Sequence, residues 1–282
     1  MMAINALLLD ERTRSLLPAG EVLRDWRHRR HLTQQGLASA AGVSLRLLAA
    51  LEAGRTLPNR DVMLRLTERL DVPLRDRNAM LAAAGHAPAF PARPLHHPDL
   101  AATRRMIEDA VAGCMPNPAL ALDRHWTVLT ANGVLKDMIA GVDPMLRTEP
   151  VNWARLALHP AGLAPRIANL RDWHGHVMTC LRQDIEATGD PVLAELQEEI
   201  RDYPMPAASA AAGESNAAAT PFRLMTVEGA LSFYTATTQF RSAIDVTLSE
   251  LRIQTFYPVD AATARLMRQT AARITARRAT AG

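Results

Sequence analysis

Cysteine is scarce in this chain of 282 residues, which contains only Cys114 and Cys180. Two thiols exclude a disulfide-rich scaffold and a four-thiolate zinc site, and they fit a reducing compartment. No apolar run approaches the ~20 residues that a membrane-spanning helix needs. The first residues, MMAINALLLDERTRS, lack the leading positive charge of a secretory signal, and acids directly follow their apolar patch. We therefore expect a cytoplasmic protein with no membrane partner.

Sequence motifs of common enzymes are also missing. The chain has no nucleophile elbow, no phosphate-binding loop and no His-Glu-x-x-His run. Its acidic groups, such as Asp184 with Glu186, have the spacing of a solvated helix face. We therefore expect no catalytic residue and no enzyme activity. An enzyme with an accessory DNA-binding domain is the alternative that a screen for turnover would support.

Positive charge is concentrated in the N-terminal third of the chain. Residues 1–90 carry 13 Arg against 9 Asp and Glu, a net charge of +4, whereas the remainder carries 19 Lys and Arg against 20 acids. A basic segment favours a phosphate-backbone partner, although an excess of this size also fits an ordinary solvated surface. The charge pattern therefore directs attention to the N-terminal part without deciding its function.

The stretch LTQQGLASAAGVSLRLLAALEAGR, residues 32–55, has the capping residues of two short helices. Thr33 and Ser44 are favoured N-cap residues, which predicts helices over 34–40 and 45–53. A glycine between the two helices supplies the left-handed turn, and a second glycine ends the latter helix. Apolar spacing predicts three flanking helices and a buried face. The flanking helices are 20–30, 60–70 and 74–84, with Asn59 as a cap, and the inward residues include Val22, Leu23, Trp26, Leu37, Ala38, Leu48, Leu51, Val62, Leu66 and Leu70.

With its continuation TLPNRDVMLRLTERLDVP, this stretch resembles the helix-turn-helix domain of the xenobiotic-response-element and lambda-repressor-like family. The resemblance covers about residues 20–86. It implies a mostly α, five-helix domain, which we bound at 19–86, whose third helix enters the major groove of double-stranded DNA.

The start of that third helix supplies the candidates for DNA contact. Arg46 is the outward residue able to hydrogen-bond a base, with guanine as its expected partner, and Leu45 could contact a thymine methyl group. Gln34 resembles a phosphate-contacting glutamine of the family, whereas Glu52 is expected to form an ion pair within the domain. The expected DNA-contacting residues are Arg27, Arg30, Gln34, Ser44, Leu45, Arg46, Ala49, Ala50 and Arg55.

The outward face of this helix departs from the family in having few polar residues. Leu47, Ala49 and Ala50 occupy positions where polar or aromatic residues are common, so base specificity could depend on DNA shape. The alternative is a protein-interaction module that keeps the helix-turn-helix fold without reading bases.

Residues 87–98 form an expected linker, within the proline-rich segment HAPAFPARPLHHP. We interpret His96 and His97 as linker residues and expect no metal site. Residues 99–280 then form the second domain. Apolar patterns predict two strands, a helical insert, three strands and a terminal helix, which is an α+β layout. The predicted strands are 119–122, 126–130, 222–227, 230–240 and 248–257; the helices are 101–115, 133–140 behind Asn132, 152–158, 166–188, 191–201 and 261–278. We also expect a partly ordered lead-in over residues 1–18 and a low-complexity loop over 207–220.

NPALALDRHWTVLTAN, GALSFYTATTQF and DVTLSELRIQTFYPVDAATARLM resemble the MmyB-like ligand-binding domain over most of residues 95–270. The resemblance implies a PAS-like sheet with helices over one face and a small-molecule pocket. Apolar or fatty-acid-like effectors are implied, with no obligatory cofactor. The residues expected to line the pocket are Trp126, Met138, Trp153, Trp173, His174, Met178, Phe233 and Phe240. The alternative for each is that its side chain fills the core. His176 and Cys180 lie on the same predicted helix, where a surface histidine and an inert thiol are the simpler interpretations.

These features together predict a transcription regulator that binds double-stranded DNA as a homodimer and is controlled by a small-molecule effector.

Overall fold

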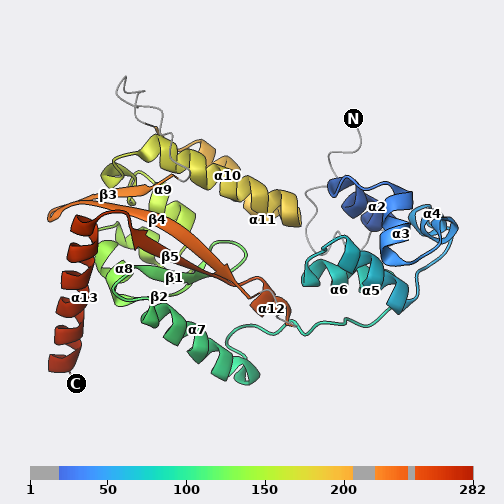
Figure 1. Cartoon of the computed structure of the whole chain (residues 1–282), viewed down its shortest axis with the longest axis horizontal. Coiled ribbons are helices and arrows are strands. Elements are labelled where there is room, and N and C mark those ends of the chain that lie inside the picture. The colour runs from blue at the N-terminus through green and yellow to red at the C-terminus, as the bar shows by residue number, and fades with distance from the viewer. Residues whose placement is uncertain (1–18, 206–219, 241–244, 282) are drawn as a thin grey trace. The chain divides into compact units, whose positions relative to one another are not determined.

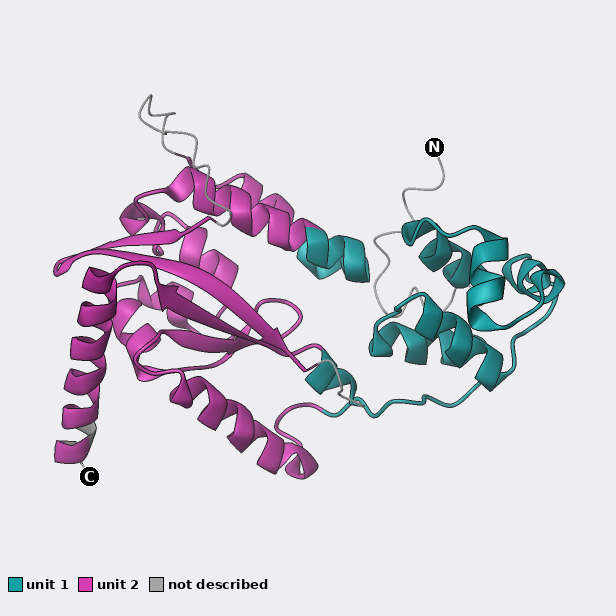
Figure 2. Cartoon of the chain, viewed as in Figure 1, with its two compact units in different colours: residues 1–93, 183–194, 243–249 teal, residues 94–182, 195–242, 250–282 magenta. Residues whose placement is uncertain are grey.

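The computed structural model describes residues 19–205, 220–240 and 245–281 (Figure 1). The expected lead-in over 1–18 and nearly all of the expected loop over 207–220 lie outside the described residues. The chain divides into two compact units (Figure 2). The first comprises residues 1–93, 183–194 and 243–249, and the second comprises 94–182, 195–242 and 250–282. Within the described residues, no helix is long and apolar enough to cross a membrane.

Five helices form the N-terminal bundle, and each lies within two residues of its predicted bounds. They are α2 (Ala19–Arg29), α3 (Gln34–Ala41), α4 (Leu45–Glu52), α5 (Arg60–Arg69) and α6 (Leu74–Ala83). The predicted caps form because their side-chain oxygens accept a backbone N–H of the first turn. Thr33 Oγ1 accepts from Gly36 at 3.0 Å, and Asn59 Oδ1 accepts from Val62 at 2.8 Å.

The turn between α3 and α4 requires Gly42. Its φ of 63° lies in the left-handed region that favours glycine, and its N–H donates to the carbonyls that end α3. The helices then close over a single apolar core, in which Leu37, Leu48 and Leu66 are fully buried. The predicted inward residues are all members of this core.

The second unit is built on one antiparallel sheet of strand order β2-β1-β5-β4-β3. The strands are β1 (Ala119–Leu122), β2 (Val128–Ala131), β3 (Phe222–Thr226), β4 (Gly229–Gln239) and β5 (Arg252–Pro258). The helices that follow the bundle are α7 (Ala101–Gly113), α8 (Gly133–Met138), α9 (Trp153–Leu158), α10 (Leu170–Thr188), α11 (Pro191–Arg201), α12 (Val246–Ser249) and α13 (Ala261–Ala281). Of these, α12, the end of α10 and the start of α11 belong to the first compact unit. Short 3-10 turns lie at η2 (Pro98–Leu100), η3 (Pro144–Arg147) and η4 (Ala164–Arg166).

An aromatic cluster fixes α9 and α10 on one face of this sheet (Figure 1). The Trp153 ring on α9 meets Phe256 of β5 edge-on, with ring centroids 5.7 Å apart. On α10, the Trp173 ring lies 4.9 Å from Phe222 of β3. Both tryptophans are almost completely buried. The helices that carry them are therefore held against the sheet by apolar and aromatic packing.

Two predicted element bounds are wrong by four residues, and each has a local cause. The strand expected over 248–257 begins at Arg252, because Asp245 Oδ1 accepts the N–H of Thr247 at 2.9 Å and starts the short helix α12. The helix expected over 166–188 begins at Leu170, because the preceding residues pair with β3 instead. The N–H of Ala168 donates to the carbonyl of Arg223 at 2.9 Å.

Candidate functional site

The start of α4 is an exposed end of an otherwise anchored helix. Ser44 Oγ accepts the N–H of Leu47 at 3.1 Å and so fixes the first turn. Leu48 and Leu51 on the opposite face are buried in the bundle core. Arg46 is exposed, and Leu45 retains 47% of its accessible surface. The helix therefore presents its N-terminal end outward, as a major-groove reading helix does.

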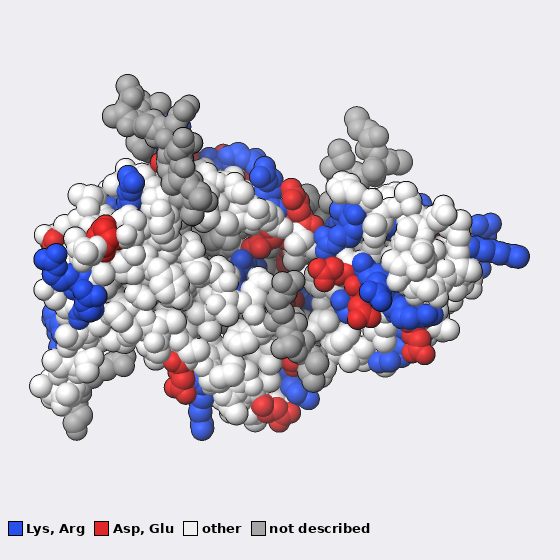
Figure 3. Space-filling view, viewed as in Figure 1, with Lys and Arg blue, Asp and Glu red and all other residues white. Residues whose placement is uncertain are grey.

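The remaining outward positions near α4 are small or lie past its end. Ala49 and Ala50 are half-buried, and Arg55 is exposed. On the face shown in Figure 3, the arginine side chains of this bundle are interspersed with Asp and Glu. Arg46 and Arg55 are thus two exposed cations close to the start and the end of the helix, and their DNA contacts stay predictions.

Arg27 was expected to contact phosphate, and the structure corrects this assignment. Its guanidinium donates to both carboxylate oxygens of Glu52, at 2.7 Å and 2.8 Å, and to the carbonyl of Leu32 at 2.8 Å. Arg27 is 7% exposed and Glu52 is 2% exposed. The geometry is that of a buried bidentate ion pair, which leaves this arginine unavailable to DNA. The ion pair expected for Glu52 is confirmed.

Gln34 and Arg30 are also held by the bundle. Gln34 Nε2 donates to Glu52 Oε2 at 2.8 Å, which connects α3 to α4. Arg30 donates to the carbonyls of Leu70 at 2.8 Å and Asp71 at 3.1 Å. Both side chains remain partly exposed, so their DNA contacts stay predictions, but each has a structural role that the sequence did not indicate.

The buried pair has a defined charge state. Hydrogen bonding to Glu52 raises the pKa of the Arg27 guanidinium. Burial alone would raise the pKa of Glu52, but hydrogen bonds from Arg27 and Gln34, with the charges of Arg27 and Arg24, outweigh burial and hold that pKa below its ordinary value. The ion pair therefore stays charged at neutral pH and fixes α2, α3 and α4 relative to one another.

Replacing Ser44 with alanine is expected to lower the free energy of unfolding of the bundle by about 1 kcal/mol, because α4 loses its N-cap acceptor. Hydrogen exchange of the α4 amides under increasing denaturant measures this change. Ser44→Asn is the matched control, since asparagine also caps well and should stay within a few tenths of a kcal/mol of the wild type. Equal destabilisation by both substitutions would contradict the capping role.

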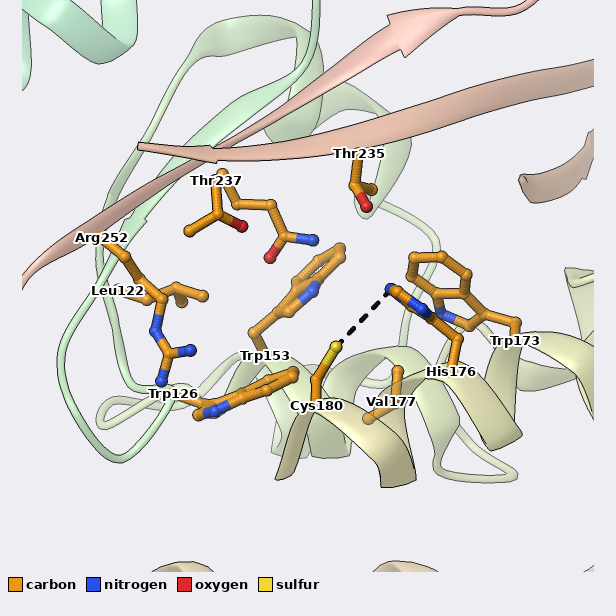
Figure 4. A pocket seen from close by; sticks show the side chains of 11 residues that line it. Leu122, Trp126, Trp153, Trp173, His176, Val177, Cys180, Thr235, Thr237 and Arg252 are labelled. Atoms are coloured by element: carbon orange, nitrogen blue, oxygen red, sulfur yellow. Dashed lines mark hydrogen bonds between the residues drawn. The ribbon is translucent and has the colours of Figure 1, made fainter. Parts of the chain in front are cut away.

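The second unit contains a partly open cavity of about 170 Å³ between the sheet and the helices α9 and α10 (Figure 4). Strand alternation explains one wall: Arg252, Gln254 and Phe256 share a face of β5. The register then sets Gln254 opposite Thr237 and Phe256 opposite Thr235 of β4. The complete lining is Leu122, Trp126, Trp153, Trp173, His176, Val177, Cys180, Thr235, Thr237, Arg252 and Gln254.

Polar groups of the cavity lie among aromatic rings. The Arg252 guanidinium lies over the Trp126 ring, 5.1 Å from its centroid. Cys180 Sγ lies 3.7 Å from His176 Nε2, one helical turn away. Burial lowers the pKa of His176, which favours the neutral imidazole. The indole nitrogen of Trp173 is buried and has no hydrogen-bond partner among the described residues.

Three of the eight predicted pocket residues line this cavity: Trp126, Trp153 and Trp173. The other five do not. His174 Nε2 lies 3.2 Å from the carbonyl of Ile200, and the Phe233 ring packs in the aromatic cluster. Met138, Met178 and Phe240 are not lining residues of this cavity.

Half of the eight lining residues outside the predicted set are polar strand residues. Sequence patterns select large apolar side chains, whereas this wall consists of Thr235, Thr237, Arg252 and Gln254. The signal that could have found Arg252 and Gln254 is their spacing of two on either side of Ile253, which puts both polar side chains on one face of β5. His176 faces the cavity instead of His174 because the two residues point to different sides of α10.

A helix-turn-helix bundle joined to an α+β unit with an internal cavity defines the class of ligand-sensing, DNA-binding transcription regulators. Comparison with protein families gives the same result for each part. Residues 19–80 match a helix-turn-helix domain family, and residues 103–269 match the MmyB-like transcription regulator ligand binding domain. The second match covers more than half of the chain, so the chain belongs to the MmyB-like transcription regulator family. No curated protein matches the chain. Both matched families are parts of transcription regulators rather than of enzymes.

Proposed function

We propose that this chain is a cytoplasmic, homodimeric regulator that reads a specific DNA sequence through α4 and responds to a small organic acid in the cavity. The observation that carries the DNA-reading part is the exposed, Ser44-capped start of α4, with Arg46 directed outward. Dimerisation is proposed because helix-turn-helix proteins commonly bind two half-sites one helical turn apart. The arrangement of five antiparallel strands with helices and a cavity on one face supports a PAS-like description of the second unit.

Replacing Arg46 with alanine is expected to lower the preference for one base pair of the selected site by roughly 1–3 kcal/mol, because a bidentate contact to guanine is lost. The measurement is site selection from a randomised duplex pool, followed by affinities of the wild-type and variant chains for the selected site and its single-base substitutions. Arg65→Ala is a control, because Arg65 donates to the carbonyl of Gly42 from α5. If Arg46→Ala leaves the base preference unchanged, the assignment of the reading residue is wrong.

The effector is proposed to be an acid with an apolar body, a class that includes fatty acids. The cavity supports this class because it combines three indole rings with the guanidinium of Arg252. A second hollow of about 410 Å³ is lined by Pro160, Ala164, Pro165, Ile167, Ala168, Leu170 and Pro204, which offer no polar side chain to orient a ligand. The first cavity is therefore the better effector site.

A route from the cavity to the linker is present in the chain. In the first compact unit, the N–H of Val246 donates to the carbonyl of Pro91 at 2.8 Å, and Thr247 Oγ1 donates to the carbonyl of Arg93 at 2.5 Å. These donors lie on α12, and β5 begins three residues after it with the cavity residue Arg252. An effector that prefers one position of Arg252 would bias the α12–linker hydrogen bonds, which is the differential binding that allostery needs.

The second candidate function is a protein-interaction module that retains the helix-turn-helix fold. The small residues Ala49 and Ala50 on the outward side of α4 favour it, since they offer no side-chain hydrogen bond to bases. The selection experiment separates the two candidates: an interaction module would recover no preferred duplex, whereas a sequence reader would recover one that Arg46→Ala changes.

A further inference from the structure

The first long helix after the linker has one exposed apolar side. α7 packs on β1 and β2, and its buried side chains are Ile107 and Val111. Its opposite side is exposed, and Met106 keeps 47% of its accessible surface there. Figure 1 shows α7 at the margin of the second unit, with the sheet on one side of the helix. The exposed side is therefore open to a partner outside this chain.

A stripe of small and apolar residues runs along this exposed side. Residues three or four positions apart lie on the same side of a helix. From the start of α7 to its end, the stripe consists of Ala102, Met106, Ala110 and Gly113. Each of these residues is exposed. An added Cβ on Gly113 would meet nothing within 4 Å, so no described neighbour requires a glycine there. Small residues at such a contact allow two helix axes to approach closely.

Two opposite charges lie along one edge of the stripe. Arg105 and Asp109 are exposed, one helical turn apart on that edge, and neither forms an ion pair within the described part of the chain. Arg104 and Glu108 lie on the side that faces away from the stripe, and they approach each other to 3.9 Å. The other edge of the stripe, at Thr103, is uncharged. The exposed side thus has a cation and an anion on a single edge.

This arrangement of charge is complementary to itself. When two identical helices pack antiparallel about a twofold axis, each edge of one helix lies beside the same edge of the other, with the direction of the chain reversed. Arg105 of each copy then lies beside Asp109 of the other copy. A parallel arrangement would instead set the charged edge against the uncharged one. Charge complementarity therefore favours a second copy of α7, in the antiparallel orientation, as the partner.

We propose that α7 forms the homodimer interface by packing antiparallel against α7 of a second copy. Met106 and the small residues of the stripe form the apolar centre of the contact, and Arg105 pairs with Asp109 of the second copy along its edge. This assignment rests on the proposed homodimer and names its contact surface. Because α7 follows η2 at the end of the linker, the dimer would also set the distance between the two linkers.

The test is sedimentation equilibrium of the full chain without DNA, over a range of protein concentrations. Arg105→Asp and Asp109→Arg, made separately, each set like charges against one another in both halves of the contact. Each is expected to raise the dimer dissociation constant about tenfold or more. The two substitutions combined exchange the charges and restore the pairing, so the dissociation constant should return to within about threefold of the wild-type value.

A matched control lies one residue away on the same helix. Glu108→Arg makes the same change of charge as Asp109→Arg, but on the side that faces away from the stripe, and it is expected to leave the dimer unchanged. Met106→Glu brings an unpaired carboxylate into the apolar centre and should weaken the dimer about tenfold or more. All of these residues are exposed, and recovery of the dimer in the combined variant cannot result from misfolding.

A dimer that is unchanged by both single charge reversals overturns α7 as the interface and leaves the proposed homodimer standing. A wild-type chain that is monomeric at every concentration overturns both proposals. If the combined variant dimerises as weakly as the single reversals, the pairing of Arg105 with Asp109 is wrong. Because the samples contain no DNA, none of these results changes the outcome of the Arg46 experiment, which measures base preference.

Discussion

Replacing Glu52 with alanine is expected to lower the free energy of unfolding of the helix-turn-helix bundle by about 3–5 kcal/mol, because it leaves the Arg27 guanidinium buried without its counter-ion. The carboxylate of Glu52 also accepts from Gln34, so the substitution removes links from α4 to both α2 and α3. Hydrogen exchange in the helices α2 to α5 under increasing denaturant measures the loss for this part of the chain.

Glu68→Ala is the matched control, since Glu68 is an exposed carboxylate of α5 and should change stability by about 0.5 kcal/mol or less. A Glu52→Ala variant as stable as the control would show that the buried pair contributes nothing beyond a surface charge. Arg27→Met with Glu52→Leu replaces both partners by apolar residues and is expected to recover much of the loss.

The same pair should make the bundle sensitive to acid. The folded-state pKa of Glu52 lies below its ordinary value, so its contribution to stability is present above the unfolded-state pKa and is lost as pH falls through the folded-state pKa. Denaturation of Glu52→Gln across this acidic range should therefore depend less on pH than denaturation of the wild type. If the free energy of unfolding of the wild type and of Glu52→Gln changed equally with pH, the lowered pKa of Glu52 would be contradicted.

Replacing Gly20 with alanine is the second substitution for which we expect a large effect, a loss of about 3 kcal/mol of unfolding free energy. A Cβ on Gly20 would lie 2.0 Å from the carbonyl oxygen of Leu51 and 3.3 Å from the Cα of Glu52. These are backbone atoms at the end of α4, so the clash is relieved only by moving the reading helix. The affinity for the selected duplex should fall together with the stability.

Gly175→Ala makes the same substitution inside α10, where a Cβ meets nothing within 4 Å. This control should stabilise its helix by about 0.5–1 kcal/mol, since alanine has the higher helix propensity. If close packing of α2 on α4 is the reason for the loss, denaturation should show a lower free energy of unfolding for Gly20→Ala and a higher one for Gly175→Ala. A Gly20→Ala chain with unchanged stability and DNA affinity would exclude that close approach.

Local features of the helix-turn-helix bundle could be predicted from the sequence because their determinants are adjacent in the chain. Thr33, Ser44 and Asn59 each cap a helix through a backbone group three residues away. Gly42 takes the left-handed turn for which it was expected. The Arg27–Glu52 pair spans 25 positions, and a charged residue gives no local sign of which partner it will meet or whether it will be buried.

The cavity was predicted less well for a related reason. Its lining depends on the register between β4 and β5, which brings Thr235 and Thr237 beside Arg252 and Gln254. The choice of large apolar residues included three tryptophans that line the cavity, but it also included Phe233, which packs in the aromatic core. Size and hydrophobicity alone do not distinguish a side chain that faces a cavity from one that fills the core.

The assignment of Arg27 and Glu52 to the core changes how DNA affinity is expected to arise. Of the arginines first considered, Arg46 and Arg55 are exposed beside α4, while Arg30 donates to backbone carbonyls of the bundle. Few phosphate contacts per bundle imply modest affinity for one half-site. Two linked bundles in a homodimer would raise the total affinity, and the linker between each bundle and its cavity-bearing unit would then set their spacing.

Affinity of the full chain for the selected duplex across a series of salt concentrations tests the central claim most directly. For a DNA-binding regulator, the logarithm of the association constant should fall linearly with the logarithm of salt concentration, by about 0.9 for each phosphate contacted. Arg46→Ala should keep most of this slope while losing base preference. Absence of duplex binding at low salt, or an affinity that does not depend on salt, would contradict the claim that this bundle binds DNA.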